Sequence, residues 1–426
     1  MTKNKIAIDT AWSYAAFAVM AAAGLTINVV VGAVFGATGL GVFGQAMAIF
    51  VIAGHVSAAG LHNAAFRSIA LAPGSAAGIL ASALAAALPF ALGTALLALL
   101  CAPAIGQALD SPATAAAILW MAPGLLFFGL NKIGLAALNG ASLMRRHAIG
   151  QMLRYLVIGG TVAAVAACDD SPDRLGAAFS LAEITVSLYL AGATRPLYRS
   201  GAPRGVSVRH ATEMLQFGLR SFGASLMADI NLRVDTLMLG LFLGDREVGI
   251  YAFASMLVEG LGNVALVLRN LLNPGLTRLL AAGDGAAIRR LVTQVQIVAW
   301  PVLVLVFLAA WQLYQPAVRL LVGAGDLEQG LAALLILIAL MAPYLTYSTF
   351  EEILMLAGHA GAQSVFQLSV TFANALLNLL LIPPLGIEGA AIATGLSSVF
   401  ACLLLVWMVR QRTGHLLLPS VFRLRL

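Results

Sequence analysis

Long apolar runs separated by short polar connections dominate this sequence. An α-helix needs about 20 largely apolar residues to cross the hydrocarbon core of a bilayer, and about twelve runs reach that length. Because a helix satisfies its backbone hydrogen bonds internally, where lipid offers no water, we predict an all-α integral membrane protein. The connections leave no room for a soluble domain. The predicted transmembrane helices lie near 11–33, 42–66, 76–101, 114–138, 148–168, 175–194, 213–243, 247–272, 291–314, 331–357, 361–382 and 387–409.

Charge is scarce in this chain and unevenly placed. Only 10% of the residues are charged, against about a quarter in soluble domains. Basic residues near the ends of the runs gather on one side, which the positive-inside rule makes cytoplasmic, so both termini are expected in the cytoplasm. Membrane lipids explain the net charge of +6, and no nucleic-acid partner is needed. The three cysteines lie far apart, and no metal site is expected.

The two halves of the chain resemble each other in sequence. GLGVFGQA from Gly39 matches EVGIYAFA from Glu247, and the MAP segment at Met121 matches the one at Met341. Two further matches keep the same order, Pro89 with Pro301 and Gly176 with Gly389. An even number of spans per half gives parallel repeats. We therefore predict two six-helix lobes around a central cavity, residues 1–200 and residues 201–426.

The seventh run carries more charge than lipid tolerates. Ionisable side chains in a membrane usually face a water-filled cavity or a partner. At 100° per residue, Arg220, Asn231 and Asp235 fall on one face of this run, and Asp229 and Arg233 fall on the opposite face. One face is expected to line a substrate path. An intrahelical ion pair between Asp229 and Arg233 is the alternative for the other face.

Two histidines of the second run share one helix face. His55 and His62 are seven residues apart, and Arg67 follows near the cytoplasmic boundary. Histidine titrates near neutral pH and could carry a coupling proton. Polar packing between helices is the alternative for the histidines, and membrane anchoring is the alternative for Arg67.

The repeat places opposite charges at one equivalent position. Asn131 and Lys132 in the first half correspond to Glu351 and Glu352 in the second half. Our hypothesis is that Lys132 forms a closing contact or an ion site across the lobe interface with one of these glutamates. Arg154 and Glu183 are further charges within predicted spans, and residue spacing does not identify their partners. Arg269, at the end of the eighth run, is expected to snorkel to the headgroups.

Sequence motifs of catalysis are absent, and a family resemblance points to transport instead. The sequence has no phosphate-binding Gly-Lys-Ser/Thr loop and no HxxxH pair, so no enzymatic activity and no cofactor are expected. The segments GATGLGVFGQAMAIF (36–50) and VDTLMLGLFLGDREVGIYAFAS (234–255) resemble polysaccharide flippases of the multidrug/oligosaccharidyl-lipid/polysaccharide exporter superfamily. Such proteins include O-antigen and exopolysaccharide flippases, and many of them have fourteen spans.

The resemblance implies a substrate and a location. It implies that the chain moves an undecaprenyl-diphosphate-linked oligosaccharide across the bacterial inner (cytoplasmic) membrane by alternating access, for cell-surface polysaccharide and lipopolysaccharide biosynthesis. Glycosyltransferases and a polymerase of the same pathway are the further partners that it implies. A cation-coupled multidrug exporter of the same superfamily is the first alternative, and it would favour acidic residues in the first lobe. A polysaccharide polymerase or ligase is the second, and a scaffold without transport is the third.

Residues of matching chemistry can be assigned to such a substrate. A lipid diphosphate needs cationic donors, and sugars need amide and hydroxyl groups. A coupling ion, H⁺ or Na⁺, needs titratable side chains. The candidates are, for phosphate, Arg220, Arg233, Lys132, Arg154 and Arg67; for sugar, Asn28, Asn231, Tyr347 and Asn374; and for coupling or gating, Asp229, Asp235, His55, His62, Glu183, Glu351 and Glu352.

Overall fold

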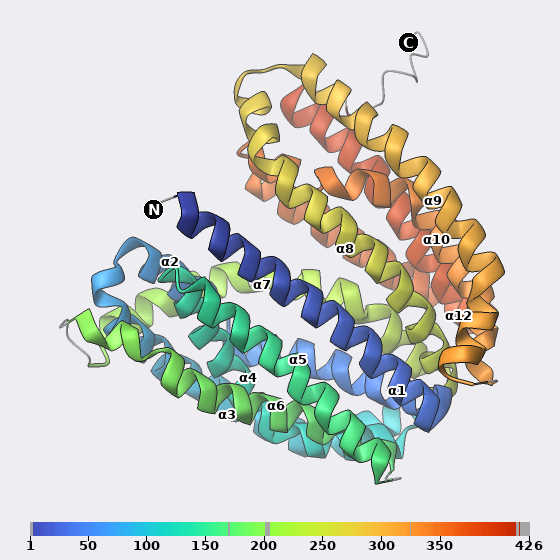
Figure 1. The fold of residues 1–426 in the computed structure, drawn as a ribbon, viewed down its shortest axis with the longest axis horizontal. Coiled ribbons are helices and arrows are strands. Elements are labelled where there is room, and N and C mark those ends of the chain that lie inside the picture. The colour runs from blue at the N-terminus through green and yellow to red at the C-terminus, as the bar shows by residue number, and fades with distance from the viewer. Residues whose placement is uncertain (1–2, 169–170, 201–204, 324, 415–416, 418–426) are drawn as a thin grey trace. The chain divides into compact units, whose positions relative to one another are not determined.

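The computed structural model describes residues 3–168, 171–200, 205–323, 325–414 and 417. Within these residues the structure contains twelve α-helices and no β-strand. The predicted all-α class is confirmed, but the twelve helices do not correspond one to one to the twelve predicted spans. The chain forms two compact units, residues 1–229 (unit 1) and residues 230–426 (unit 2), with helix α7 passing from one to the other (Figure 1). The lobe boundary expected after residue 200 adjoins residues 201–204, which lie outside the described residues, so the two lobes remain a prediction.

Unit 1 contains six complete helices and most of a seventh. Short 3-10 turns follow α2, α5 and α6. The helices are α1 (Lys3–Ala58), α2 (Leu61–Leu71), α3 (Ala76–Ala108), α4 (Pro112–Gly140), α5 (Met144–Ala167), α6 (Ala177–Ala193) and α7 (Val208–Phe242).

Unit 2 contains the end of α7 and the remaining helices. A 3-10 turn at Ser348–Phe350 separates two of them, and the last helix is the longest of the unit. The helices are α8 (Asp245–Ala281), α9 (Gly285–Leu321), α10 (Leu331–Tyr347), α11 (Ile353–Leu356) and α12 (Ala360–Thr413).

The first and last of these helices each contain a sharp bend at a glycine. Gly36 in α1 has φ 66°, and Gly386 in α12 has φ 60° and follows Pro383 and Pro384. Positive φ is the conformation that glycine adopts without a Cβ penalty. The two helices have 56 and 54 residues, and at 1.5 Å per residue each is more than twice as long as the ~30 Å hydrocarbon core. Each bend lies between two of the predicted spans, which explains why one continuous helix accounts for two apolar runs.

Nine helical segments of the described residues are long and apolar enough to cross a membrane. The difference from the twelve predicted spans has two causes. The long helices α1 and α12 each contain two apolar runs. Helix α7 corresponds to the seventh run, but it is not among the nine, and five ionisable residues fall within that run.

The predicted second span, 42–66, is broken rather than continuous. The structure ends α1 at Ala58 and begins α2 at Leu61, with Ala59 and Gly60 both at positive φ. A Cβ at Gly60 would lie 2.2 Å from the carbonyl oxygen of Gly218 in α7. Close approach of two backbones is therefore the physical reason for the break, and only glycine fits there.

Helix α4 lies at the centre of the packing in unit 1. It contacts α1, α2, α3, α5 and α6, and these contacts use small residues. A Cβ at Gly124 would meet the backbone of Ser180, and one at Gly129 would meet Ser57. Small residues let membrane helices approach closely. This packing brings polar side chains of α2, α4 and α5 into one neighbourhood.

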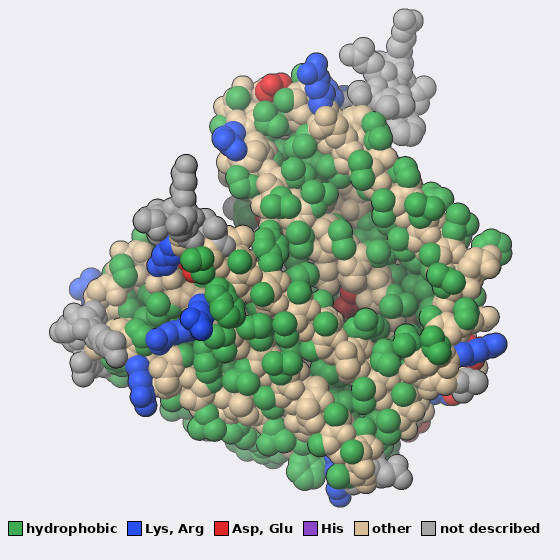
Figure 2. All heavy atoms as spheres, in the orientation of Figure 1, with side chains coloured by type: hydrophobic (Ala, Val, Ile, Leu, Met, Phe, Trp, Pro, Cys, Tyr) green, Lys and Arg blue, Asp and Glu red, His purple; other side chains and the backbone are tan. Residues whose placement is uncertain are grey.

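The visible surface is largely apolar. Figure 2 shows hydrophobic side chains spread across the face, with few basic and acidic side chains among them. Exposed leucines on α3, α9 and α12 belong to this surface. A lipid environment accounts for such exposure, because an apolar surface of this extent is unusual on a soluble monomer.

Candidate functional site

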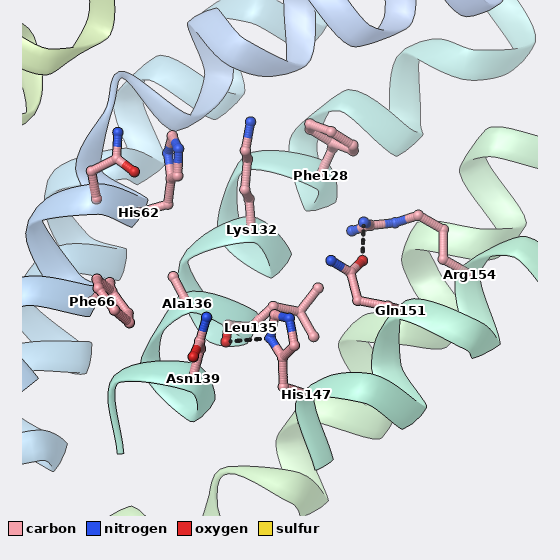
Figure 3. A pocket seen from close by; sticks show the side chains of 11 residues that line it. His62, Phe66, Phe128, Lys132, Leu135, Ala136, Asn139, His147, Gln151 and Arg154 are labelled. Carbon is pink, nitrogen blue, oxygen red and sulfur yellow. Dashed lines mark hydrogen bonds between the residues drawn. The ribbon is translucent and has the colours of Figure 1, made fainter. Parts of the chain in front are cut away.

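A cavity of about 330 Å³ lies within unit 1 between α2, α4 and α5 (Figure 3). Polar and basic side chains make much of its wall, although the helices that supply them are mostly apolar. The described lining residues include no aspartate or glutamate. They are His62, Asn63 and Phe66 from α2; Phe128, Lys132, Leu135, Ala136 and Asn139 from α4; and His147, Gln151 and Arg154 from α5.

Lys132 is one of the two basic groups of the cavity wall, and its ammonium group contacts the imidazole of His55. Its Nζ atom lies 2.6 Å from Nε2 of His55. The Nδ1 atom of His55 lies 2.5 Å from a carboxylate oxygen of Asp229 on α7. Because a lysine ammonium has no acceptor, Nε2 of His55 accepts a hydrogen bond from Nζ of Lys132. In neutral His55, Nδ1 then carries the hydrogen and donates a hydrogen bond to Asp229.

Arg154 is the second basic group, and a glutamate compensates its charge directly. Its Nε atom donates to Oε1 of Glu183 at 2.5 Å, and its Nη2 atom donates to Oε2 at 3.2 Å. The Glu183 side chain is only 1% exposed. Asn131 donates to the same Oε2 at 2.8 Å and accepts from Ser187. The buried carboxylate is thus paired and hydrogen-bonded, as a charge in a low-dielectric interior must be.

Two histidines, His62 and His147, line the cavity, and His55 lies next to His62. The rings of His55 and His62 are 6.1 Å apart, so the predicted shared face brings them together. Nδ1 of His62 is buried and has no hydrogen-bond partner among the described residues. His147 lies on the opposite side, with Nδ1 3.0 Å from the carbonyl oxygen of Leu135. Figure 3 shows His62 and His147 on different sides of Lys132.

Three of the predicted substrate-facing residues of unit 1 do not line this cavity. Arg67 is exposed, and its guanidinium lies 5.2 Å from the centre of the Phe217 ring. Arg220 is also exposed. Asn28 donates its side-chain amide to the carbonyl oxygen of Gly24, one turn earlier in α1. Of the phosphate candidates, only Lys132 and Arg154 come together in the cavity.

A second polar cluster lies inside unit 2 around Asp235, which is 8% exposed. Its Oδ1 accepts from Asn374 at 3.0 Å and from Asn378 at 2.7 Å. Its Oδ2 accepts from Tyr251 at 3.1 Å and lies 2.6 Å from the hydroxyl of Thr394. Among the described residues no basic side chain forms an ion pair with Asp235. The four described groups that donate to this buried carboxylate are therefore all neutral.

Other charges of unit 2 pair at a different place. Glu351 accepts from Arg269 at 2.8 Å, and Glu352 accepts from Asn273 at 2.8 Å. Arg269 therefore forms an ion pair and is only 17% exposed, whereas the sequence predicts that it snorkels. Contacts within unit 2 thus engage both glutamates that we predicted to face Lys132 across the lobes.

The remaining candidates of unit 2 lie in mixed surroundings. The hydroxyl of Tyr347 donates to the carbonyl oxygen of Leu417 within a hydrophobic cluster. Asn231 is half-buried, and its Oδ1 atom has no hydrogen-bond partner among the described residues. Arg233 is half-buried and is a charged neighbour of Glu259. The intrahelical partner proposed for Asp229 is replaced by His55 of α1.

Sequence reasoning missed several members of both clusters. Gln151 and His147 of the cavity, and Asn378, Tyr251 and Thr394 around Asp235, were not among the candidates. Asn378 could have been found from the sequence. It lies four residues after the candidate Asn374 in an apolar run, so the two share a helix face. The other residues are ordinary polar side chains whose roles depend on tertiary contacts.

Comparison with solved structures defines the class of this fold. The lipid II flippase MurJ in an inward closed conformation superposes with a TM-score of 0.76 at 15% identity, covering 93% of this chain and 87% of that one. An inward-facing multidrug resistance MATE family transporter of the MOP superfamily gives 0.74 at 15% identity, covering 93% and 94%. A MOP superfamily transporter from Pyrococcus furiosus gives 0.66 at 13% identity, covering 94% and 93%. The chain therefore has the fold of MOP superfamily transporters and is a multi-pass integral membrane protein.

The family follows from the sequence itself. The family model described as "Polysaccharide biosynthesis protein" matches residues 38–324, more than half of the chain. The chain belongs to this polysaccharide biosynthesis protein family, which confirms the resemblance seen in residues 36–50 and 234–255. No curated protein sequence gives a significant match.

Proposed function

We propose that the chain translocates an undecaprenyl-diphosphate-linked oligosaccharide across the bacterial inner membrane by alternating access. In this proposal the halves 1–200 and 201–426 are six-helix lobes around a central cavity, and both termini are cytoplasmic. Nine long apolar segments with α7, and the bends at Gly36 and Gly386, are compatible with twelve spans. The bilayer is crossed without covalent change, so no catalytic group is required.

The observation that carries the proposal is the polar cavity of unit 1, in a member of a polysaccharide biosynthesis family. Lys132 and Arg154 supply positive charge there, and Asn63, Asn139 and Gln151 supply amides. Amides and cations are the groups that bind sugars and anions. The diphosphate would use arginines that retain exposure, for which Arg220, Arg233 and Arg67 are the candidates.

Asp235 is our candidate for the coupling site. A buried carboxylate without a basic partner is costly as an isolated anion, and binding of a proton or a cation offsets that cost. The side-chain amide nitrogens of Asn374 and Asn378 and the hydroxyl of Thr394 donate to Asp235 and hold it in place. Its own carboxylate oxygens are the ligands that a hard cation prefers. We propose that H⁺ or Na⁺ binds here during transport.

The multidrug exporter is the second candidate, because a MATE family transporter is nearly as similar in fold to this chain as the lipid II flippase is. An exporter of organic cations would want a free carboxylate in the cavity. Glu183 lies behind the wall and is bound to Arg154, and the described lining contains no acidic residue. The charge of the cavity therefore favours an anionic substrate.

Deletion of the gene in its native host, without a redundant flippase, tests the proposal. We expect the lipid-linked oligosaccharide to accumulate on the cytoplasmic leaflet and surface polysaccharide to be lost. Expression of the intact chain should reverse both effects, and a Lys132→Gln chain present at equal abundance should restore less. Normal polysaccharide export in the deletion strain would contradict the proposal.

A further inference from the structure

The wall of the unit 1 cavity contains a lysine, a residue type that is rare in this chain. The sequence has 21 arginines and three lysines, and two of these lysines, Lys3 and Lys5, stand at the N-terminus. The third is Lys132, in the middle of α4 and on the cavity wall. Lysine presents a compact point charge, whereas arginine presents a planar fork suited to two oxygens of a phosphate.

The wall of the cavity offers about one positive charge to a ligand. Arg154 and Glu183 form a two-point ion pair at 2.5 and 3.2 Å, so their charges cancel locally. Lys132 forms no direct ion pair with a carboxylate among the described residues. Its contact at 2.6 Å is with the imidazole of His55, which separates it from the carboxylate of Asp229 behind the wall. An ammonium has three donors, so two remain for a ligand. A singly charged oxyanion matches this balance, and a diphosphate does not.

The other side chains of the cavity suit a sugar ring. Phe66 and Phe128 provide apolar faces on two sides, and the amides of Asn139 and Gln151 lie on the wall with them (Figure 3). The side-chain amide oxygen of Gln151 accepts from Arg154 at 3.1 Å. This contact fixes the amide and leaves its nitrogen as a donor. The volume of about 330 Å³ is at the small end of the roughly 300–1,000 Å³ range of ligand pockets. It therefore fits a small unit of an oligosaccharide.

We propose that this cavity is a subsite for one carboxylated, uronic-acid-type sugar of the transported oligosaccharide. The sugar carboxylate accepts hydrogen bonds from Nζ of Lys132 and from the amide of Gln151. His55 and Asp229 position Lys132 from behind, and the Arg154–Glu183 pair shapes the wall without adding net charge. This subsite rests on the proposed function, and it separates recognition of the sugar from recognition of the diphosphate.

Lysine footprinting of the purified full-length protein in a neutral detergent tests the subsite. A water-soluble acetylating reagent modifies lysines, and mass spectrometry gives the rate at Lys132 relative to Lys5, which is the internal control. The ligands are glucuronate, its uncharged methyl ester, inorganic pyrophosphate and glycerophosphoglycerol, a soluble lipid headgroup. Glucuronate should slow acetylation of Lys132 about tenfold more than the ester does, the factor that corresponds to ~1.4 kcal/mol for one charged hydrogen bond. Acetylation of Lys5 should not change.

Each other outcome has a defined meaning. Equal protection by the ester would show that charge is not recognised, and stronger protection by pyrophosphate would show a phosphate site. Protection by glycerophosphoglycerol equal to that by glucuronate would assign the cavity to a lipid headgroup. Any of these results overturns the subsite. The binding assay needs no transport, so trapping of the lipid-linked oligosaccharide in the deletion strain would leave the proposed function standing if the subsite failed.

Discussion

Replacement of Glu183 should destabilise unit 1 more than replacement of any surface charge does. The Glu183 side chain is 1% exposed, accepts from Arg154 at 2.5 and 3.2 Å, and accepts from Asn131 at 2.8 Å. Breaking a buried ion pair by removing one partner costs about 3–5 kcal/mol, because the other charge stays buried. Arg154 retains 13% exposure and can recruit water, which places Glu183→Gln near the lower end, about 3 kcal/mol. For a cooperative unit of the size of unit 1, this corresponds to a fall in Tm of roughly 6–12 °C.

The assay is thermal unfolding of the detergent-solubilised protein at one fixed scan rate, because unfolding of such proteins is often irreversible. The matched control is Glu213→Gln, which removes the acid of an exposed pair with Arg209 and should leave Tm unchanged. The double variant Arg154→Met, Glu183→Gln removes both charges and should be more stable than Glu183→Gln alone. A double variant that loses the sum of the two single effects would refute this reasoning, since the two groups would then act independently.

Three further predictions follow from particular contacts. Gly60→Ala should prevent the close approach of α2 to the backbone of Gly218 and sharply lower the yield of folded protein. The control Gly74→Ala, at a position with open space around it, should leave the yield unchanged. Equal yields of the two variants would contradict the packing argument. Asp235→Asn should abolish the dependence of transport on a proton or Na⁺ gradient, measured as uptake with and without each gradient, and an unchanged dependence would exclude Asp235 as the coupling site. Lys132→Gln should reduce transport of an acidic oligosaccharide about tenfold while a neutral one is unaffected, and equal losses for both would point to a structural role.

Most of the long helices of this protein could be predicted from hydrophobic length, although α7 is a long helix that is not among the nine apolar segments. Most of the predicted spans correspond to helix in the structure, and residues 361–382 and 387–409 both lie in α12. The predicted spans 42–66 and 331–357 are each interrupted, the first between α1 and α2 and the second between α10 and α11. The interruptions were harder to predict. The break at Gly60 depends on a backbone more than 150 residues later in the sequence, and no local pattern reports such a contact. The bend at Gly386, by contrast, has a local signal in Pro383 and Pro384.

The ionisable residues were identified from the sequence, but their partners were not. Placement of Lys132, Arg154 and Glu183 within apolar runs marks them as groups that need partners. The pairing of Arg154 with Glu183 joins α5 to α6, and the contact of His55 with Asp229 joins α1 to α7. Such choices depend on helix rotation and on packing of small residues, which periodicity within one helix does not specify.

The two buried carboxylates differ in their hydrogen-bond partners, and this difference is the basis of the roles that we assign to them. In unit 1 the buried carboxylate of Glu183 has a guanidinium partner, whereas in unit 2 the buried carboxylate of Asp235 has four neutral donors. A compensated charge gives stability and shape, and an uncompensated one responds to ions. This contrast is why we assign Glu183 to the framework of the cavity and Asp235 to coupling.

Transbilayer movement of the substrate by the purified chain tests the central claim most directly. The full-length protein is reconstituted into liposomes with a labelled undecaprenyl-diphosphate oligosaccharide, and an impermeant glycosidase added outside reports how much substrate is accessible. In liposomes preloaded with substrate on the inner leaflet, we predict that the accessible fraction rises with time when the intact chain is present. When the oligosaccharide is acidic, the accessible fraction should rise more slowly with Lys132→Gln. Identical rates in protein-containing and protein-free liposomes, with and without proton and Na⁺ gradients, would contradict the account.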